Sequence, residues 1–115
     1  MDEVSLGSGE KIRLKTQGTL LLRSTWQLGH LFLTDKRLIF IQANKTVMEF
    51  RLDKIVQVNT MQRSWLMGIK VRQLCMEFNS GSGREHAYIA LAKPGEWVAA
   101  IKEAMALMLF YTQQA

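Results

Sequence analysis

The sequence predicts a mainly β protein in which seven antiparallel strands curl into a bent barrel, with one C-terminal α-helix as its cap. Two observations lead to this prediction. Short runs of branched and aromatic side chains follow one another along residues 11–92, separated only by short polar or glycine-containing segments. From residue 94 onward the composition changes to strong helix formers. Short turns without an intervening helix favour an antiparallel sheet that folds back on itself.

Size and composition limit the class of protein. The chain has 115 residues, of which 48% are hydrophobic and 22% charged, as in ordinary soluble domains. We expect a loose leader over residues 1–9 and one domain over residues 10–115. The single cysteine, Cys75, cannot form an internal disulfide, and the sequence shows no signal peptide and no apolar run of about 20 residues. The expectation is a cytoplasmic protein, either soluble or peripheral to a membrane.

The strands are predicted from side-chain alternation. Residues 29–34 and 37–42 are apolar runs on either side of a polar turn, which predicts a hairpin. Residues 46–52 alternate between apolar and polar side chains, as in a strand with one buried face. Further strands are expected over residues 11–23, 55–60, 69–79 and 84–92, with loops over residues 24–28 and 61–68. Within 69–79 the apolar positions change parity, which predicts a bulge or a strong coil near Arg72 and Gln73.

The helix is predicted over residues 94–111, with Pro94 in its first turn. One face collects the apolar residues expected to plug the barrel: Trp97, Val98, Ile101, Met105 and Met108. Past Glu103 the helix is apolar on every side. We interpret Leu107, Leu109 and Phe110 as a partner interface, which a second copy of the chain could occupy. The alternative is that this end folds back within the domain, against the N-terminal segment.

One stretch of the sequence carries a recognisable pattern. It reads Gly29-His30-Leu31-Phe32-Leu33-Thr34-Asp35-Lys36-Arg37-Leu38-Ile39-Phe40, followed by Phe50-Arg51-Leu52-Asp53-Lys54-Ile55 and a Trp-containing terminal helix. In this order of elements, from residue 10 to about residue 105, the chain resembles the GRAM domain family of the PH-like superfold. The resemblance implies a bent seven-stranded barrel capped by one C-terminal helix. It also implies a non-enzymatic module that binds phosphoinositides, other membrane lipids or proteins.

Basic residues are concentrated in one part of the chain. Residues 11–72 carry twelve Lys/Arg against three Asp/Glu, within a total net charge of +5. Such a surface can attract anionic membrane lipid; the alternative is that these cations only solvate outward strand positions. The candidate lipid-binding residues are Lys11, Arg13, Lys15, Arg23, Lys36, Arg37, Arg63, Trp65, Lys70 and Arg72. A pocket specific for phosphoinositides needs several converging cations, and residues 29–34 supply only His30. The sequence therefore does not support such a pocket, and diffuse attraction stays open.

The predicted loop over residues 61–68 is a candidate membrane anchor. Trp65, Leu66 and Met67 are adjacent apolar residues with Arg63 beside them. An apolar tip next to cations suits the interface of a bilayer, where Trp lies at headgroup level and Arg meets phosphate. The alternative is that the loop covers the barrel as an apolar lid.

The sequence contains no pattern typical of an enzyme. His30 and His86 both fall on predicted strands, and no HxH, HExxH, CxxC or GxSxG spacing occurs. We therefore predict a protein without catalytic residues, metal or cofactor. The strand phenylalanines fall at expected core positions, not on an exposed face for base stacking, which argues against nucleic acid. The predicted function is binding of anionic membrane lipid or, alternatively, of a protein partner.

Overall fold

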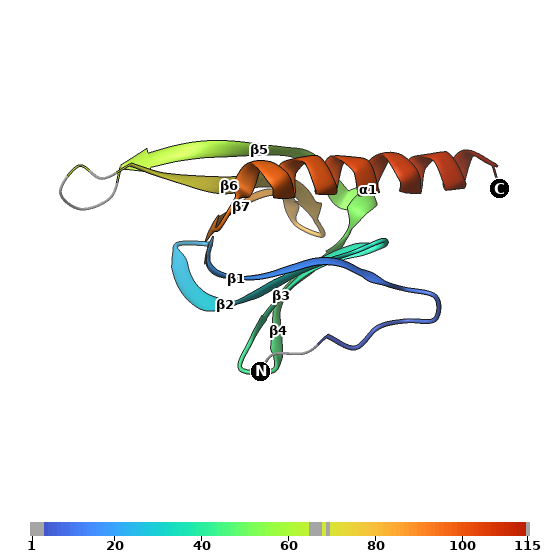
Figure 1. Ribbon diagram of the computed structural model, residues 1–115, viewed down its shortest axis with the longest axis horizontal. Helices are drawn as coiled ribbons and strands as arrows, with labels where there is room; N and C mark the ends of the chain where they lie inside the picture. The colour runs from blue at the N-terminus through green and yellow to red at the C-terminus, as the bar shows by residue number, and fades with distance from the viewer. Residues whose placement is uncertain (1–3, 65–67, 69, 115) are drawn as a thin grey trace.

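The structure is a computed structural model in which residues 4–64, 68 and 70–114 are described, with the side chains of 63–64 and 110–114 left out. Seven strands, one turn of 3-10 helix and one α-helix follow in order (Figure 1). They are β1 (Ile12–Leu22), β2 (Thr25–Thr34), β3 (Arg37–Gln42), β4 (Lys45–Arg51), η1 (Leu52–Lys54), β5 (Ile55–Ser64), β6 (Lys70–Ser80), β7 (Gly83–Leu91) and α1 (Pro94–Gln114). The predicted fold class is confirmed.

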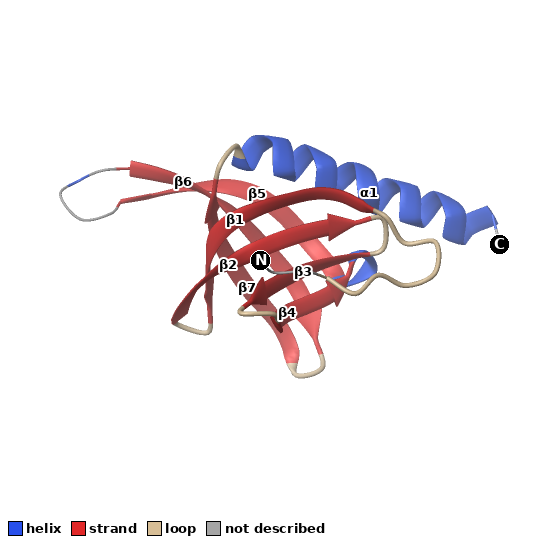
Figure 2. Ribbon diagram, turned by 60° about the horizontal axis from the view of Figure 1, so that its bottom comes forward, coloured by secondary structure: helices blue, strands red, loops and turns tan. Residues whose placement is uncertain are grey.

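All seven strands form one antiparallel sheet in the order β4-β3-β2-β1-β7-β6-β5. The sheet bends so that β5–β7 pass behind β1–β4 (Figure 2). It is not closed, which corrects the expectation of a complete barrel. Leu52–Lys54 form η1 between β4 and β5, so these two strands do not continue as a hairpin, and they are the two edges of the sheet. The helix packs against β5, β6 and η1.

The core lies between the bent sheet and α1. Apolar side chains from every strand join one buried cluster, which also contains Trp97, Ile101 and Ala104 of the helix. Within it, the rings of Phe50 and Phe78 stack with their centroids 4.3 Å apart. The helix face predicted from the sequence is therefore the face that packs on the sheet. Burial of these large apolar side chains is the main contribution to the stability of the fold.

Two segments predicted as loops extend strands instead. The chain reverses at Arg23 and Ser24, so β2 already begins at Thr25, and Trp26 is paired with Leu21. Both turn residues have positive φ, 50° and 67°, which is uncommon without Gly, Asn or Asp, and the turn therefore left no sequence signal. At the other hairpin, β5 continues to residue 64, because residues 61–64 pair with residues 70–73.

The predicted bulge near Arg72 and Gln73 is wrong. The register of β6 with β5 is continuous there, and the register shifts occur elsewhere in the sheet, between residues 12 and 14, 40 and 41, and 55 and 57. Gln73 and Leu74 point to opposite faces of the strand, yet both are fully buried. The strand is thus covered on both sides at this point, and the change of apolar parity needs no extra residue.

The glycine that opens the hairpin pattern has a packing reason. A Cβ built on Gly29 would lie 2.3 Å from the carbonyl oxygen of Ile41 in the neighbouring strand β3. No side chain fits at that distance without movement of the backbone. Gly29 thereby allows β2 and β3 to approach closely.

Candidate functional site

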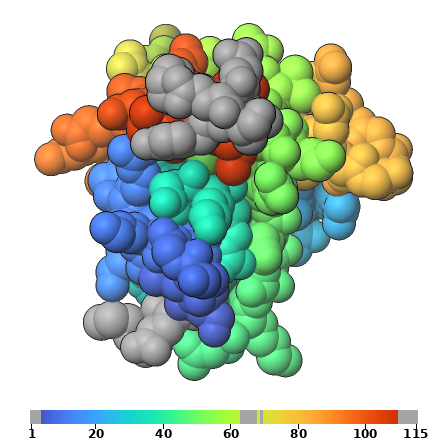
Figure 3. Space-filling view, turned by 90° about the vertical axis from the view of Figure 1, so that its right-hand side faces the viewer, coloured from blue at the N-terminus to red at the C-terminus, as the bar shows by residue number. Residues whose placement is uncertain are grey.

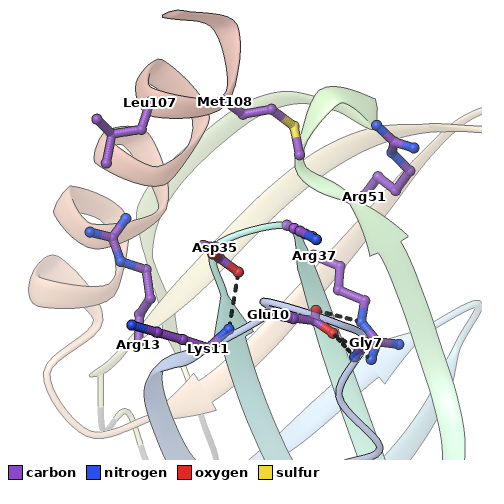
Figure 4. Close-up of a pocket in the computed structure, with 10 residues that line it drawn as sticks. Gly7, Glu10, Lys11, Arg13, Asp35, Arg37, Arg51, Leu107 and Met108 are labelled. Carbon is purple, nitrogen blue, oxygen red and sulfur yellow. Dashed lines mark hydrogen bonds and ion pairs between the residues drawn. The ribbon is translucent and has the colours of Figure 1, made fainter. Parts of the chain in front are cut away.

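A hollow of about 1010 Å³ opens where the last turns of α1 extend past the sheet. Figure 3 shows this end of the molecule, with the N-terminal segment and the β2–β3 turn below the helix. The hollow is lined by Gly7, Glu10, Lys11, Arg13, Asp35, Lys36, Arg37, Arg51, Leu107 and Met108. Basic side chains thus come together from β1, the β2–β3 turn, the start of β3 and the end of β4 (Figure 4).

An ion pair between the buried Glu10 and the half-buried Arg37 forms one wall of the hollow. Arg37 donates from Nε and Nη2 to the two oxygens of Glu10, at 2.8 and 3.0 Å. The hydroxyl of Thr34 donates to Glu10 Oε2 at 2.6 Å, and the backbone N–H of Gly7 donates to Oε1 at 2.8 Å. The Glu10 side chain is only 3% exposed. These donors, the Arg37 guanidinium above all, outweigh burial and lower the pKa of Glu10 to about 2.

The Arg37 guanidinium also forms hydrogen bonds on the side that faces away from Glu10. Its Nη1 donates to both carboxylate oxygens of Glu49 at 3.1 Å, and Nη2 contacts the carbonyl oxygen of Ser5. Hydrogen bonding to Glu10 is the main reason that the pKa of Arg37 is raised. Its backbone N–H also donates to the hydroxyl of Thr34 at 3.0 Å. Among the cations that line the hollow, Arg37 is therefore the one held most firmly by contacts within the fold.

Two other arginines of the hollow are held loosely. Arg13 Nη2 lies 4.0 Å from a carboxylate oxygen of Glu103 on α1, and Arg51 Nε lies 3.5 Å from Asp53. All four side chains are at least one-third exposed. Exposed ion pairs of this kind contribute little, about 1 kcal/mol or less, so both guanidinium groups can turn toward an anion at small cost.

The two lysines of the hollow have no acidic partner among the described ion pairs. Lys11 uses its backbone N–H to donate to Asp35 Oδ1 at 3.2 Å, and its side chain is exposed. Lys36 donates from Nζ to the carbonyl oxygen of Ser8 at 3.2 Å. Their ammonium charges are therefore available to an anionic ligand.

The structure separates the remaining lipid-binding candidates from this hollow. Lys15 is exposed on β1, outside the hollow, and Arg23 pairs with Glu85 at the β1–β2 turn. The 2.6 and 2.9 Å hydrogen bonds between these side chains raise the pKa of Arg23 and lower that of Glu85. Neither residue lies with the cations of the hollow.

The hairpin of β5 and β6 extends away from the last turns of α1, which line the hollow (Figure 1). It carries Lys70 and Arg72, both exposed. The side chain of Arg63 and the whole of Trp65, which were predicted to bind lipid here, lie outside the described residues. The candidates therefore do not form one basic surface.

The last turns of α1 supply an exposed apolar side chain above the cations. Leu107 is 39% exposed and Leu109 is 59% exposed, while Met108 is half-buried and packs on the core. The side chain of Phe110, the third residue of the predicted partner interface, lies outside the described residues. Leu107 and Met108 border the hollow, whereas Leu109 does not.

Sequence reasoning missed several residues of the hollow. Glu10 gave no local signal, because its partner Arg37 lies 27 residues away. Arg51 resembled any outward-facing strand residue, and Asp35 any turn residue. Only knowledge of the folded chain brings them together.

No family model and no curated protein matches this chain. Among solved structures, it is similar to the Vps36 N-terminal PH domain, with a TM-score of 0.67 and 25% identity over 92% of this chain and 86% of that one. The fold is PH-like.

Two further structures share this PH-like fold. One is the C-terminal domain of an unknown protein from Leishmania infantum, with a TM-score of 0.62 and 14% identity over 86% of this chain and 87% of that one. The other is the DH/PH domains of p115-RhoGEF, with a TM-score of 0.55 and 16% identity over 84% of this chain and 31% of that one. PH-like domains generally serve as non-catalytic modules that bind lipids or proteins. No helix in the described residues is both long and apolar enough to span a bilayer.

Proposed function

We propose that this PH-like domain is a non-catalytic, cytoplasmic module that binds peripherally to anionic membrane lipid through the basic hollow. One observation carries the proposal: Lys11, Arg13, Lys36 and Arg51 line a single hollow whose rim includes the partly exposed Leu107. Cations converging beside an apolar side chain match the chemistry of a membrane surface, where phosphate lies next to hydrocarbon.

The shape of the molecule favours contact through one end. Its principal extents are 52 × 29 × 28 Å. The last turns of α1, which line the hollow, and the β5–β6 hairpin lie toward opposite ends of the long axis (Figure 1). A flat membrane that meets the hollow end-on therefore does not reach Lys70 and Arg72 of the hairpin. We place the membrane at the hollow because four cations gather there.

Sedimentation with lipid vesicles tests this proposal. Vesicles of phosphatidylcholine with phosphatidylserine are compared with vesicles of phosphatidylcholine alone, at several salt concentrations. The variant Lys11→Glu/Lys36→Glu removes the two available lysines. Lys45→Glu/Lys93→Glu is the matched control, since it changes net charge equally at exposed residues outside the hollow.

Each lysine near an anionic membrane contributes about 1 kcal/mol, so loss of two weakens binding by roughly 30-fold, and charge reversal by more. The control variant is expected to bind nearly as the unaltered protein, and added salt to weaken binding of both. The proposal is wrong if both double variants pellet equally. Loss of binding only in Lys70→Glu/Arg72→Glu would instead assign the membrane contact to the hairpin.

A second candidate function is supported by the exposed helix end. Leu107 and Leu109 leave apolar surface uncovered, which suits a protein partner or a second copy of the chain. Light scattering without lipid distinguishes this candidate from membrane binding. A dimer mass that falls to the monomer mass in Leu109→Asp supports it, and a monomer at high concentration excludes self-association.

A further inference from the structure

We infer that the hollow binds a lipid with a single anionic group, either a phosphate or a carboxylate; this rests on the proposed function. The apolar chain of that lipid lies along Leu107 and Met108 of α1. Such a ligand has a defined charge and occupies a defined place in the fold, in the hollow that the last turns of α1 overhang. General attraction to a charged surface requires neither.

The charges of the hollow favour a ligand of low charge. Five cations line it, but Arg37 is locked between Glu10 and Glu49. The remaining four divide into two groups. Lys11 and Lys36 have no acidic partner among the described ion pairs, whereas Arg13 and Arg51 must leave Glu103 and Asp53.

Two available ammonium groups suit one phosphate or one carboxylate, and the two arginines can complete the coordination. A polyphosphate would need more cations than the hollow has available. It would also meet the carboxylate of Asp35, which lines the hollow between the cations (Figure 4).

The apolar rim makes the site amphipathic. Leu107 and Met108 lie above Lys11 and Arg13 in Figure 4, on the helix that overhangs the hollow. The exposed part of Leu107 gains from contact with a hydrocarbon chain and gains nothing from a soluble anion. A ligand with both parts therefore uses the whole lining.

A second, smaller hollow has the opposite charge. It measures about 310 Å³ and lies at the β1–β2 and β6–β7 turns, where its charged lining is Arg23, Glu49 and Glu85. Arg23 is already paired with Glu85, so an anion there would meet net negative charge. The anionic ligand is accordingly assigned to the hollow below α1.

Calorimetric titration with soluble probes tests this inference. The probes are lysophosphatidic acid below its critical micelle concentration, glycerol 3-phosphate, lysophosphatidylcholine and inositol hexakisphosphate. They present, in turn, one anion with a chain, the anion alone, the chain with a zwitterion, and many phosphates without a chain. The whole chain is used, and circular dichroism checks that each variant is folded.

Lysophosphatidic acid is expected to bind at one site per chain. Each methylene that becomes buried raises the affinity roughly fourfold, so burial of about three already gives more than 50-fold. Glycerol 3-phosphate should therefore bind at least about 50-fold more weakly than lysophosphatidic acid. Lys11→Glu/Lys36→Glu should weaken lysophosphatidic acid by roughly 30-fold or more, whereas Lys45→Glu/Lys93→Glu should not. Leu107→Gln should weaken lysophosphatidic acid and leave glycerol 3-phosphate unchanged.

Three results would overturn the inference: equal binding of glycerol 3-phosphate and lysophosphatidic acid, tighter binding of inositol hexakisphosphate, or equal binding of lysophosphatidylcholine. Failure here remains separate from failure of the proposed function. If anionic vesicles pellet the protein in a manner that depends on Lys11 and Lys36 while lysophosphatidic acid does not bind, only the single-lipid site is lost. If neither binds, both proposals fail.

Discussion

The ion pair between Glu10 and Arg37 predicts that Glu10→Gln strongly destabilises the fold. The substitution keeps the size of the side chain and removes its charge, so Arg37 loses its buried carboxylate partner. The gap between the ordinary pKa of 4.5 and the value of about 2 in the folded chain corresponds to about 3 kcal/mol at neutral pH.

The lowered pKa of Glu10 determines how the free energy of unfolding changes with pH. The folded chain holds the pKa of Glu10 below that of the unfolded chain, so the stabilisation is complete above pH 4.5 and is lost as pH falls toward 2. At pH 3 the unaltered protein should have lost roughly 2 kcal/mol of this contribution. The difference between the unaltered protein and Glu10→Gln should therefore shrink from pH 7 to pH 3.

Urea unfolding followed by tryptophan fluorescence measures both quantities, because Trp97 is buried in the core. Glu49→Gln is the control, since Glu49 also bonds Arg37 but is 38% exposed, and its loss should cost about 1 kcal/mol or less. The reasoning is refuted if Glu10→Gln changes the free energy of unfolding no more than Glu49→Gln. It is refuted equally if the difference stays the same at pH 7 and pH 3.

Two further predictions concern the same hairpin. Gly29→Ala places a Cβ 2.3 Å from the carbonyl oxygen of Ile41 and should lower the free energy of unfolding by about 2 kcal/mol or more. Gly81→Ala is the control, because a Cβ there meets no atom within 4 Å and should cost much less. Equal melting temperatures of the two variants would contradict this prediction. Thr34→Val removes a buried hydroxyl that donates to Glu10 and accepts from the backbone N–H groups of Lys36 and Arg37. It should lower the free energy of unfolding in urea by about 2 kcal/mol. An unchanged unfolding midpoint would show that water replaces these hydrogen bonds.

Local patterns in the sequence were sufficient for much of the fold. The apolar runs around residues 35–36 predicted β2 and β3, and the helical periodicity predicted that Trp97 and Ile101 pack on the sheet. Both signals depend on residues close together in the chain. The turn at Arg23 and Ser24 escaped prediction because its positive φ angles are carried by residues that do not normally signal such a turn.

The site was less predictable, since it depends on contacts between distant parts of the chain. The sequence correctly indicated an excess of cations, but it could not indicate which cations are already paired. Arg37 and Lys36 are neighbours in sequence, yet the first is held by two carboxylates and the second only by a backbone carbonyl. Closure of the sheet was equally inaccessible, because it depends on whether β4 meets β5 across η1.

The open seam between β4 and β5 has a consequence for the local unfolding of the molecule. With no hydrogen-bonded ladder joining these strands, water is kept from that side of the core by α1, which packs on β5, β6 and η1. Any fluctuation that lifts the helix thus uncovers the seam at the same moment. Amide protons of α1 and of the neighbouring part of β5 should exchange with solvent as one cooperative unit, ahead of those in the central strands β1 and β2.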